Sequence, residues 1–201
     1  MNNDACGPSD AEIVRQVVSG NVNAFEQLLK RYQNHVLIIV KKHLPHEHVL
    51  DTAQDVFMKI YQSLVTFKGE SNFGQWVSTI AIRTCYDFWR KHSKFREFPM
   101  SHFTEKHQVW LEESLSDNSS QSFHESGSKE EAKEVLDWGL DRLSAEDRMV
   151  MELVYLEGHS VKEAARLLGW TTANVKVRSF RSRRKLYNLL SKQLKHRRRG
   201  T

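Results

Sequence analysis

Residues 160–186 read SVKEAARLLGWTTANVKVRSFRSRRKL, and this stretch decides the fold more than any other part of the chain. Ser160 and Glu163 have the spacing of a capping box, in which two residues satisfy free backbone N–H groups at the start of a helix. Gly169 then allows a sharp turn, and Thr171 or Thr172 can cap a second helix. In the first helix, apolar residues recur at helical spacing at Val161, Ala164, Ala165 and Leu168. The stretch therefore predicts a helix-turn-helix at 160–186.

The second helix of this motif has two chemically different sides. Successive residues turn by about 100°, so one side should face the core with Val175, Ser179, Ser182, Leu186, Leu189 and Leu190. The other side carries Lys176, Val177, Phe180, Arg181 and Arg184. In the major groove of DNA, Arg and Lys donate to guanine and apolar groups touch the thymine methyl, so this side suits base reading. Arg178, Arg183 and Lys185 flank it and suit phosphate contacts; the alternative is a surface helix that is merely basic.

Positive charge is confined to the end of the chain that holds this motif. The last acidic residue is Glu163, and residues 166–199 contain 12 Lys or Arg. The remainder has 18 Lys or Arg against 25 Asp or Glu, a net charge of −7 in a chain whose total is +5. A positive block on a folded segment is the electrostatic signature of a polyanion binder. For 196–199 alone, a solvated tail is the simpler interpretation.

The rest of the chain also has helical patterning. We expect two helices within 10–44, a third at 49–65 and a fourth at 73–91, with a loop at 67–72. After a change of composition, two more helices are expected at 132–143 and 144–156, the second capped by Ser144. No useful length of sequence alternates as a strand would. The predicted fold class is therefore all-α, with two small helical domains.

Composition sets the expected domain boundaries. We expect an N-terminal tail at 1–9, a first domain at 10–96, a flexible linker at 97–130, a second domain at 131–192 and a basic tail at 193–201. The linker is Ser-rich and too polar to bury a core. Between Glu105 and Asp147 there are 12 acidic residues and four Lys or Arg, a net charge of −8. This region could mimic nucleic acid towards a basic channel, or serve only as a soluble tether.

The sequence argues against several classes of protein. The longest apolar run, 36–40, is too short for a membrane span, and MNNDACGPSD lacks the pattern of a signal peptide, so we expect a cytoplasmic protein. Cys6 and Cys85 form no C-x-x-C pair. His43, His46 and His48 lack the spacing of a zinc hydrolase. We expect no metal, no cofactor and no catalysis.

The third and fourth expected helices each carry a distinctive face. In the third, Asp51, Gln54, Asp55 and Met58 recur beside the apolar stripe, which suits docking on another protein's basic helices; an ordinary solvated face is the alternative. The fourth combines aromatic rings with cations, as needed to stack unpaired bases while holding phosphates. These residues are Trp76, Arg83, Tyr86, Trp89, Arg90 and Lys91, followed by Lys94 and Arg96. The spacing of Trp76 to Ile80 favours a core position.

Five stretches, taken in order, resemble the bacterial extracytoplasmic-function (ECF) sigma factors, a subfamily of the sigma-70 family. They are AFEQLLKRY at 24–32, DTAQDVFMKIYQSL at 51–64, FKGESNFGQWVSTIAIRTCYDF at 67–88, LSAEDRMVMELVYLEGHSVKEAARLLG at 143–169 and NVKVRSFRSRRKL at 174–186. Their order and spacing are specific, although no single stretch is decisive. The resemblance implies a region 2 domain and a region 4 domain joined by a linker that threads the RNA-exit path of RNA polymerase. It also implies an alternative sigma factor that directs promoter-specific transcription initiation.

The resemblance implies a role for each segment. Binding to the clamp helices of the polymerase largest subunit is implied for Asp51, Gln54, Asp55, Phe57 and Met58. Melting and reading of the minus-ten element is implied for Phe67, Lys68, Gly69, Glu70, Ser71, Asn72, Arg83, Tyr86, Trp89 and Arg90. Reading of the minus-thirty-five element is implied for Thr172, Lys176, Val177, Arg178, Arg181 and Arg184, to which the helix geometry adds Phe180 and Arg183. The implied partners are the polymerase core (clamp helices and flap), promoter DNA and an anti-sigma factor, often membrane-bound, with no direct membrane association.

The sequence departs from the family's usual pattern at three positions. Arg83 stands where a small polar residue such as Asn is common, Ser179 replaces Leu or Ile, and Trp170 replaces an aliphatic residue. We predict that Trp170 fills the volume that Ser179 leaves empty. The main alternative for the whole chain is a free-standing helix-turn-helix repressor or activator, which would bind duplex DNA without polymerase.

Overall fold

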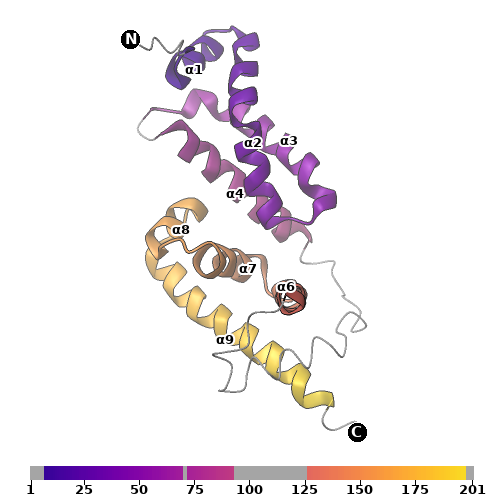
Figure 1. The fold of residues 1–201 in the computed structure, drawn as a ribbon. Coiled ribbons are helices and arrows are strands. Elements are labelled where there is room, and N and C mark those ends of the chain that lie inside the picture. The colour runs from indigo at the N-terminus through magenta and orange to yellow at the C-terminus, as the bar shows by residue number, and fades with distance from the viewer. Residues whose placement is uncertain (1–6, 70–71, 93–125, 198–201) are drawn as a thin grey trace, which may run out of the picture. The chain divides into compact units, whose positions relative to one another are not determined.

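The computed structural model describes residues 7–69, 72–92 and 126–197, with the side chains of 126–132 and 192–197 outside that description. Every regular element in these ranges is helical, which confirms the all-α fold class (Figure 1). The chain divides into two compact units, and the main division follows Phe88, close to the end of the fourth helix. None of the helices described combines the length and the apolar character that a membrane span requires.

The N-terminal unit contains four α-helices and three short 3₁₀ turns. Its α-helices are α1 (Asp10–Val18), α2 (Phe25–His43), α3 (Val49–Ser63) and α4 (Phe73–His92). The turns η1 (Val22–Ala24), η2 (His46–His48) and η3 (Leu64–Thr66) connect or extend them. Gly20 has φ 107° between α1 and η1, a conformation that a residue with a Cβ rarely adopts. The expected sequence of four helices is therefore present.

The core of this unit is built from one stripe of each helix. Fully buried members are Ile13 of α1, Leu28, Val36 and Val40 of α2, Val56 and Ile60 of α3, Leu64 of η3, and Val77 of α4. The apolar stripe of α3 is narrower than its sequence suggests, since Tyr61 is 41% exposed. The stripe of α2 is narrower as well, since Leu29 is 36% exposed. Both side chains lie at the edge of the stripe rather than beneath it.

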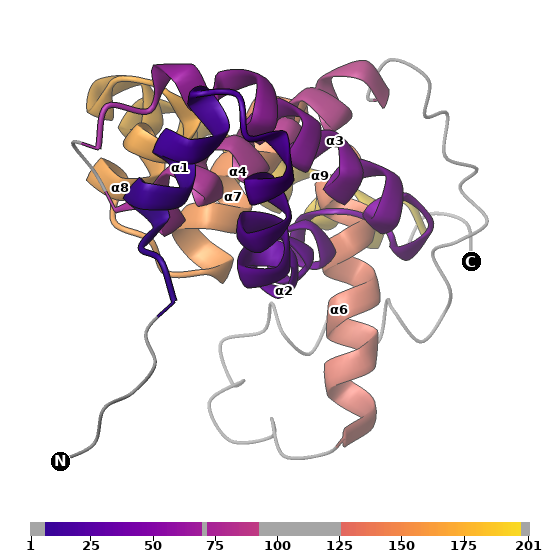
Figure 2. The same ribbon diagram turned by 90° about the horizontal axis from the view of Figure 1, so that it is seen from above.

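The C-terminal unit contains α6 (Ser126–Leu140), α7 (Ala145–Met151), a π-helical turn η5 (Glu152–Leu156), α8 (Val161–Leu168) and α9 (Thr172–Arg197). Helix α6 is seen end-on in Figure 1 and along its length in Figure 2. Leu140, Leu143, Met151 and Leu186 form a buried cluster with Leu136, Leu189 and Leu190 packed against it. Gly139 allows α6 to approach α9, because a Cβ there would lie 2.5 Å from Leu186 Cδ1.

Three expected boundaries differ from those observed. Helix α6 begins at Ser126, inside the expected 97–130 linker, where Glu130 and Ala132 favour helix. Helix α9 continues to Arg197, so the expected 193–201 tail is helical as far as 197, because no Gly or Pro interrupts 172–197. The helix expected to end near Leu156 changes to a π turn at Glu152. Residues 93–125, which hold most of the expected linker, lie outside the described residues.

Candidate nucleic-acid interface

The predicted helix-turn-helix is formed by α8 and α9. The backbone N–H of Ser160 donates to Glu163 Oε2 (2.9 Å), and that of Glu163 donates to Ser160 Oγ (3.2 Å), which completes the capping box. Gly169 has φ 72°, and the N–H groups of Trp170 and Gly169 return to the carbonyls of Ala165 (2.8 Å) and Arg166 (3.3 Å). These two bonds make a Schellman motif that ends α8 and turns the chain.

Thr171 rather than Thr172 caps α9. Its hydroxyl accepts a hydrogen bond from the backbone N–H of Asn174 (3.2 Å), whereas Thr172 is the first helical residue and is exposed. The sequence left open which of the two threonines caps α9. The capping residue is the one whose backbone is not helical, and the turn at Gly169 decides which threonine that is. The capped, exposed beginning of α9 is the part of such a helix that enters a DNA groove.

The side of α9 expected to face the core does so. Val175, Ser179, Ser182 and Leu186 are all buried. On the opposite side Lys176, Arg181 and Arg184 are exposed, Val177 is 50% exposed and Phe180 is 65% exposed. Large apolar side chains beside cations on an exposed helix face match the mixed chemistry of base edges in the major groove. We call these five residues, Lys176, Val177, Phe180, Arg181 and Arg184, the α9 outer face.

Arg178 does not belong to the α9 outer face. Its Nη1 donates to Asp147 Oδ1 (3.0 Å), and Lys185 Nζ lies 3.5 Å from the other oxygen of the same carboxylate. Asp147 belongs to α7 and is only 14% exposed at its side chain. It therefore joins α7 to one flank of α9 through two cations. No local sequence pattern signals this pairing, because Asp147 lies 31 residues before Arg178.

Ser179 and Trp170 each have a contact that we did not predict, while the packing of Trp170 into the space beside Ser179 stays a prediction. The hydroxyls of Ser179 and Tyr155 lie 3.0 Å apart and are hydrogen-bonded. Tyr155 belongs to η5, and a π turn re-aims side chains relative to an α-helix, as is common at functional sites. Trp170 is half-buried, and its ring centroid lies 5.6 Å from the Arg178 guanidinium carbon. The partner that the small Ser179 side chain meets is thus Tyr155.

The buried centre of the C-terminal unit contains an ion-pair network. Arg148, 9% exposed, donates from Nε to Glu152 Oε1 (2.7 Å) and pairs through Nη1 with Asp141 Oδ1 (2.5 Å). Beside it, burial raises the pKa of Asp137, while the charge of Arg148 opposes that rise. Arg148 of α7 thereby links the residue after α6, Asp141, to Glu152 of η5.

The acidic-polar face of α3 is exposed as predicted. Asp51, Gln54 and Asp55 are exposed, Met58 is 53% exposed, and Phe57 is half-buried. Leu50 lies beside Asp51 and is 74% exposed, which sequence analysis missed. Its signal was present, because Leu50 lies outside the phase of the buried stripe at Val49, Ala53 and Val56. An apolar side chain bordered by carboxylates suits a protein partner that carries both apolar and basic groups.

The loop at 67–72 and helix α4 hold the other candidate DNA residues. Lys68, Gly69 and Asn72 are exposed and Phe67 is half-buried, while Glu70 and Ser71 lie outside the described residues. On α4, Arg83 and Arg90 are exposed, Tyr86 is half-buried and Trp89 is 3% exposed. The expected core position of Trp76 is partly realised, since it is half-buried and packs on Phe67 and Phe73. Arg83 and Arg90 thus present exposed cations on α4, whereas the aromatic rings near them are half-buried or buried.

In the described ranges no three His, Cys, Asp or Glu side chains group closely enough to hold a metal ion. Of the histidines near Pro45, His43 is buried, and the ring of His48 packs on Phe88 with a centroid distance of 4.8 Å.

Comparison with known proteins agrees with this geometry. The family model of sigma-70 region 2 matches residues 28–95, and that of sigma-70 region 4 matches residues 139–186. The ECF RNA polymerase sigma-E factor of Escherichia coli K12 is 28% identical over 185 residues, which cover 90% of this chain and 93% of that protein. The sigma-E factor of Haemophilus influenzae is 28% identical over 182 residues, covering 90% of this chain and 94% of that protein.

A solved structure is also similar. CnrH, determined in complex with the cytosolic domain of CnrY, is 25% identical with a TM-score of 0.51, and the match covers 89% of this chain and 95% of that chain. The two region models, which lie on the two compact units, and the nearly full-length relatives agree with each other. The chain therefore belongs to the sigma-70 family of RNA polymerase sigma factors, in the ECF group to which these relatives belong.

Proposed function

We propose that this sigma factor recognises a promoter through two separate surfaces, one on each compact unit, while the N-terminal unit binds the polymerase core. The observation that carries this proposal is the α9 outer face. It exposes three cations with Val177 and Phe180, whereas the opposite side of the same helix is buried. The proposed function of the protein requires the core enzyme and the chromosome, so we place the protein in the bacterial cytoplasm.

The minus-thirty-five element would be read by the α9 outer face, with Thr172 and Arg183 as phosphate contacts. Lys176 and Arg181 can donate to guanine O6 and N7, and Val177 and Phe180 can touch thymine methyl groups. We assign Arg178 a different role from base reading, because its guanidinium is engaged by Asp147 within the unit. Arg178 would hold α9 on α7, and its loss would act through helix position.

The minus-ten element would be opened by the 67–72 loop and α4. Extruding a base costs a few kcal/mol of stacking, which a pocket and backbone contacts must offset. Phe67, Lys68, Gly69, Glu70, Ser71 and Asn72 would form the pocket edge, and Arg83, Tyr86, Trp89 and Arg90 would follow the separated strand. Because Trp89 is 3% exposed, base stacking by this ring requires it to be uncovered first.

Core binding would use the exposed face of α3. Asp51, Gln54, Asp55 and Met58 supply carboxylates, an amide and a flexible thioether, and Phe57 supports them from a half-buried position. We add Leu50, whose 74% exposure places an apolar group at the edge of this face. The complementary surface would be the clamp helices of the polymerase largest subunit, while region 4 would meet the flap.

We also propose control by an anti-sigma factor. CnrH, which resembles this chain, was solved in complex with the cytosolic domain of CnrY. The partner CnrY is described by its cytosolic domain, and we propose that the anti-sigma factor of this chain is likewise membrane-bound. It would compete with the polymerase for exposed apolar groups such as Leu50 and Met58.

Run-off transcription tests the proposal directly. The full-length chain is combined with purified core polymerase on a promoter library, and enriched templates should share two elements with a fixed spacing. With the double variant Lys176→Ala/Arg181→Ala, the enriched templates should no longer share the upstream element. Lys30→Ala removes an exposed lysine of α2 and is the matched control, with which the upstream element should remain. Site-specific duplex binding by the chain alone, without any dependence on core polymerase, would instead identify a free-standing regulator.

A further inference from the structure

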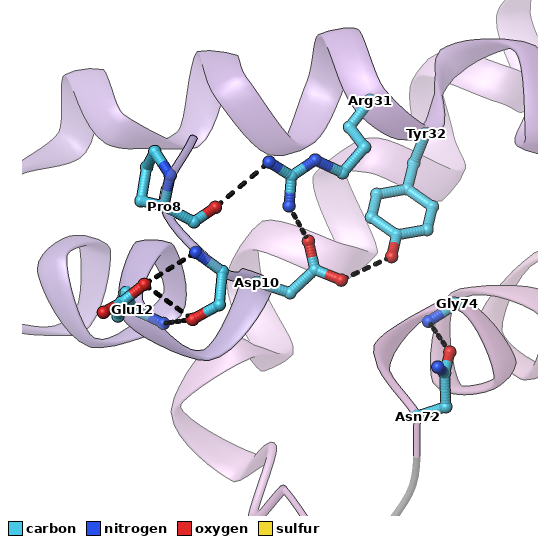
Figure 3. Close-up of polar contacts among 8 residues, drawn as sticks. Pro8, Asp10, Glu12, Arg31, Tyr32, Asn72 and Gly74 are labelled. Carbon is cyan, nitrogen blue, oxygen red and sulfur yellow. Dashed lines mark hydrogen bonds and ion pairs between the residues drawn. The ribbon is translucent and has the colours of Figure 1, made fainter. Parts of the chain in front are cut away.

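Helix α1 is tied to α2 by one carboxylate. Asp10, the first residue of α1, accepts a hydrogen bond from Tyr32 Oη at Oδ2 (2.6 Å) and pairs through Oδ1 with Arg31 (Figure 3). Arg31 also donates to the carbonyl of Pro8 (3.1 Å), directly before α1. Both residues of α2 therefore converge on Asp10. Residues 10–27 lie outside the part of the chain that matches the region 2 family model, which begins at residue 28.

Tyr32 in turn packs on the beginning of α4. Its ring lies edge-on to that of Phe73, with a centroid distance of 5.2 Å and an interplanar angle of 66°. A Cβ at Gly74 would lie 3.4 Å from Tyr32 Cε1, an ordinary contact, and 3.1 Å from Asn72 Oδ1, so Gly74 lies close to both side chains. Asn72 Oδ1 accepts from the backbone N–H of Gly74 (2.8 Å) and caps α4. Figure 3 shows Asn72 and Gly74 on the side to which the Tyr32 ring points.

The same aromatic group reaches the other end of the loop. Phe73 packs edge-on against Phe67, with a centroid distance of 5.1 Å and an interplanar angle of 86°. Trp76 lies against both rings, at 5.2 Å from Phe67 and 5.4 Å from Phe73. Tyr32 thus supports the residues that flank the loop on both sides. The hydroxyl of Tyr32 is hydrogen-bonded to Asp10.

The hydroxyl of Tyr32 keeps its proton in this position and can donate it in a hydrogen bond to Asp10. Burial, followed by the hydrogen bond and the charge of Asp10, raises the pKa of Tyr32 to about 12. The hydroxyl therefore remains protonated at any physiological pH, and the carboxylate of Asp10 always has a donor to accept from.

We propose that α1 is a positioning element for DNA-strand separation, in which Asp10 holds Tyr32 and Tyr32 fixes the two flanks of the loop between α3 and α4. This inference rests on the proposed function of that loop in opening the minus-ten element. Asp10 and Tyr32 touch no DNA in this scheme. They act through Asn72, Phe73 and Phe67, so they are positioning residues. A loop that is held in place before DNA arrives loses less conformational entropy when it captures a base.

The test compares two templates with the full chain and purified core polymerase. One template is a duplex promoter from the library, and the other is the same promoter with mismatched, pre-melted bases at the minus-ten element. Tyr32→Phe keeps the ring and removes the hydroxyl, and Asp10→Asn removes the charge. We expect each variant to slow initiation about tenfold on the duplex, the effect of losing one hydrogen bond to a charged group, and only about twofold on the pre-melted template.

Controls separate positioning from folding. A variant that is partly unfolded loses activity equally on both templates, so equal losses would overturn the inference. Glu12→Gln lies on the same helix and preserves the capping box with Ser9, so it should initiate like wild type on both templates. The double variant Asp10→Asn/Tyr32→Phe should be no slower than the slower single variant, because both act through one contact.

Failure of the inference and failure of the proposed function give different results. If wild type initiates on the duplex and Tyr32→Phe and Asp10→Asn do so at the same rate, α1 has no positioning role, although the sigma function stands. If wild type with core polymerase opens no promoter in the library, the proposed function fails, and the inference that rests on it fails too.

Discussion

The two candidate DNA-contacting regions are built in different ways. The α9 outer face is presented by a single continuous helix, whose back is fixed by Val175, Ser182 and Leu186 in the core. The described flanks of the loop before α4 are held instead by ring contacts from Phe67 through Phe73 to Tyr32. Reading duplex DNA requires side chains at fixed register, which a packed helix provides. Separating strands requires an adaptable element whose ends are nevertheless held.

The difference also concerns charge. On α9 the cations fall into two groups, since Lys176, Arg181 and Arg184 are exposed whereas Arg178 and Lys185 pair with Asp147. In the N-terminal unit, Asp10 pairs with Arg31, away from the described ends of the loop. Cations of identical type are therefore paired or left exposed on α9 according to the carboxylate within reach. The following predictions test this division, beginning with the largest expected effect.

Removal of two base-reading cations should have the largest effect. Each bidentate contact to guanine contributes about 1–3 kcal/mol of discrimination, so Lys176→Ala/Arg181→Ala should reduce promoter-specific run-off transcription by about 100-fold or more. Lys30→Ala is the control for loss of exposed positive charge. Full activity of the double variant at normal thermal stability would show that α9 is not the reading helix.

Loss of Asp147 should damage architecture instead. Asp147→Ala removes the partner of Arg178 and Lys185, and hydrogen bonds between charged groups contribute about 1.5–3 kcal/mol each. We expect a loss of about 2 kcal/mol in the free energy of unfolding, since the side chain of Lys185 is 48% exposed and adds little. Denaturant unfolding of wild type, Asp147→Ala and Asp147→Asn measures this. Unchanged stability combined with lost DNA specificity would place Arg178 back among the base readers.

Removal of one phosphate contact should have a smaller and sequence-independent effect. Arg183 is exposed on α9 and lies outside the α9 outer face. Arg183→Gln should lower the slope of log affinity against log salt by about 1 and weaken binding equally on all promoters. Fluorescence anisotropy of the holoenzyme on two unrelated promoters at several salt concentrations checks it. A preference that changes between the two promoters would contradict the assignment.

The smallest effect concerns pH. The pKa of Tyr32 is raised from 10.0 to about 12, because burial and the Asp10 carboxylate disfavour the phenolate. Because the pKa of Tyr32 is higher in the folded state, its protonated hydroxyl stabilises the fold below pH 10.0. This contribution to stability is lost as the pH rises towards 12. Titration of tyrosinate absorbance should show one late-titrating tyrosine that Tyr32→Phe removes. In Asp10→Asn the same tyrosine should titrate at lower pH, and an unchanged titration would mean that Asp10 does not hold the hydroxyl.

Several local features followed from sequence with little help. Ser160, Glu163 and Gly169 formed the capping box and the turn because each depends only on neighbours within four residues. The buried side of α9 followed from helical period. The same period predicted where the cations lie on α9, but it did not predict which of them form ion pairs. The period places Arg181 on the outer face and Arg178 on its flank, but only the tertiary structure brings Asp147, 31 residues earlier, to the Arg178 guanidinium.

By itself, the sequence determined an all-α chain of two helical units and a helix-turn-helix at 160–186, because caps, turns and periodicity are local properties. The sigma-70 assignment came from the resemblance of five stretches to that family. Tertiary structure alone decided that Tyr155 meets Ser179, that Asp147 retains Arg178, and that Asp10 reaches the loop flanks through Tyr32. These contacts join residues more than 20 positions apart. Their formation depends on how helices pack, and a packing arrangement is not encoded in any single stretch of the chain.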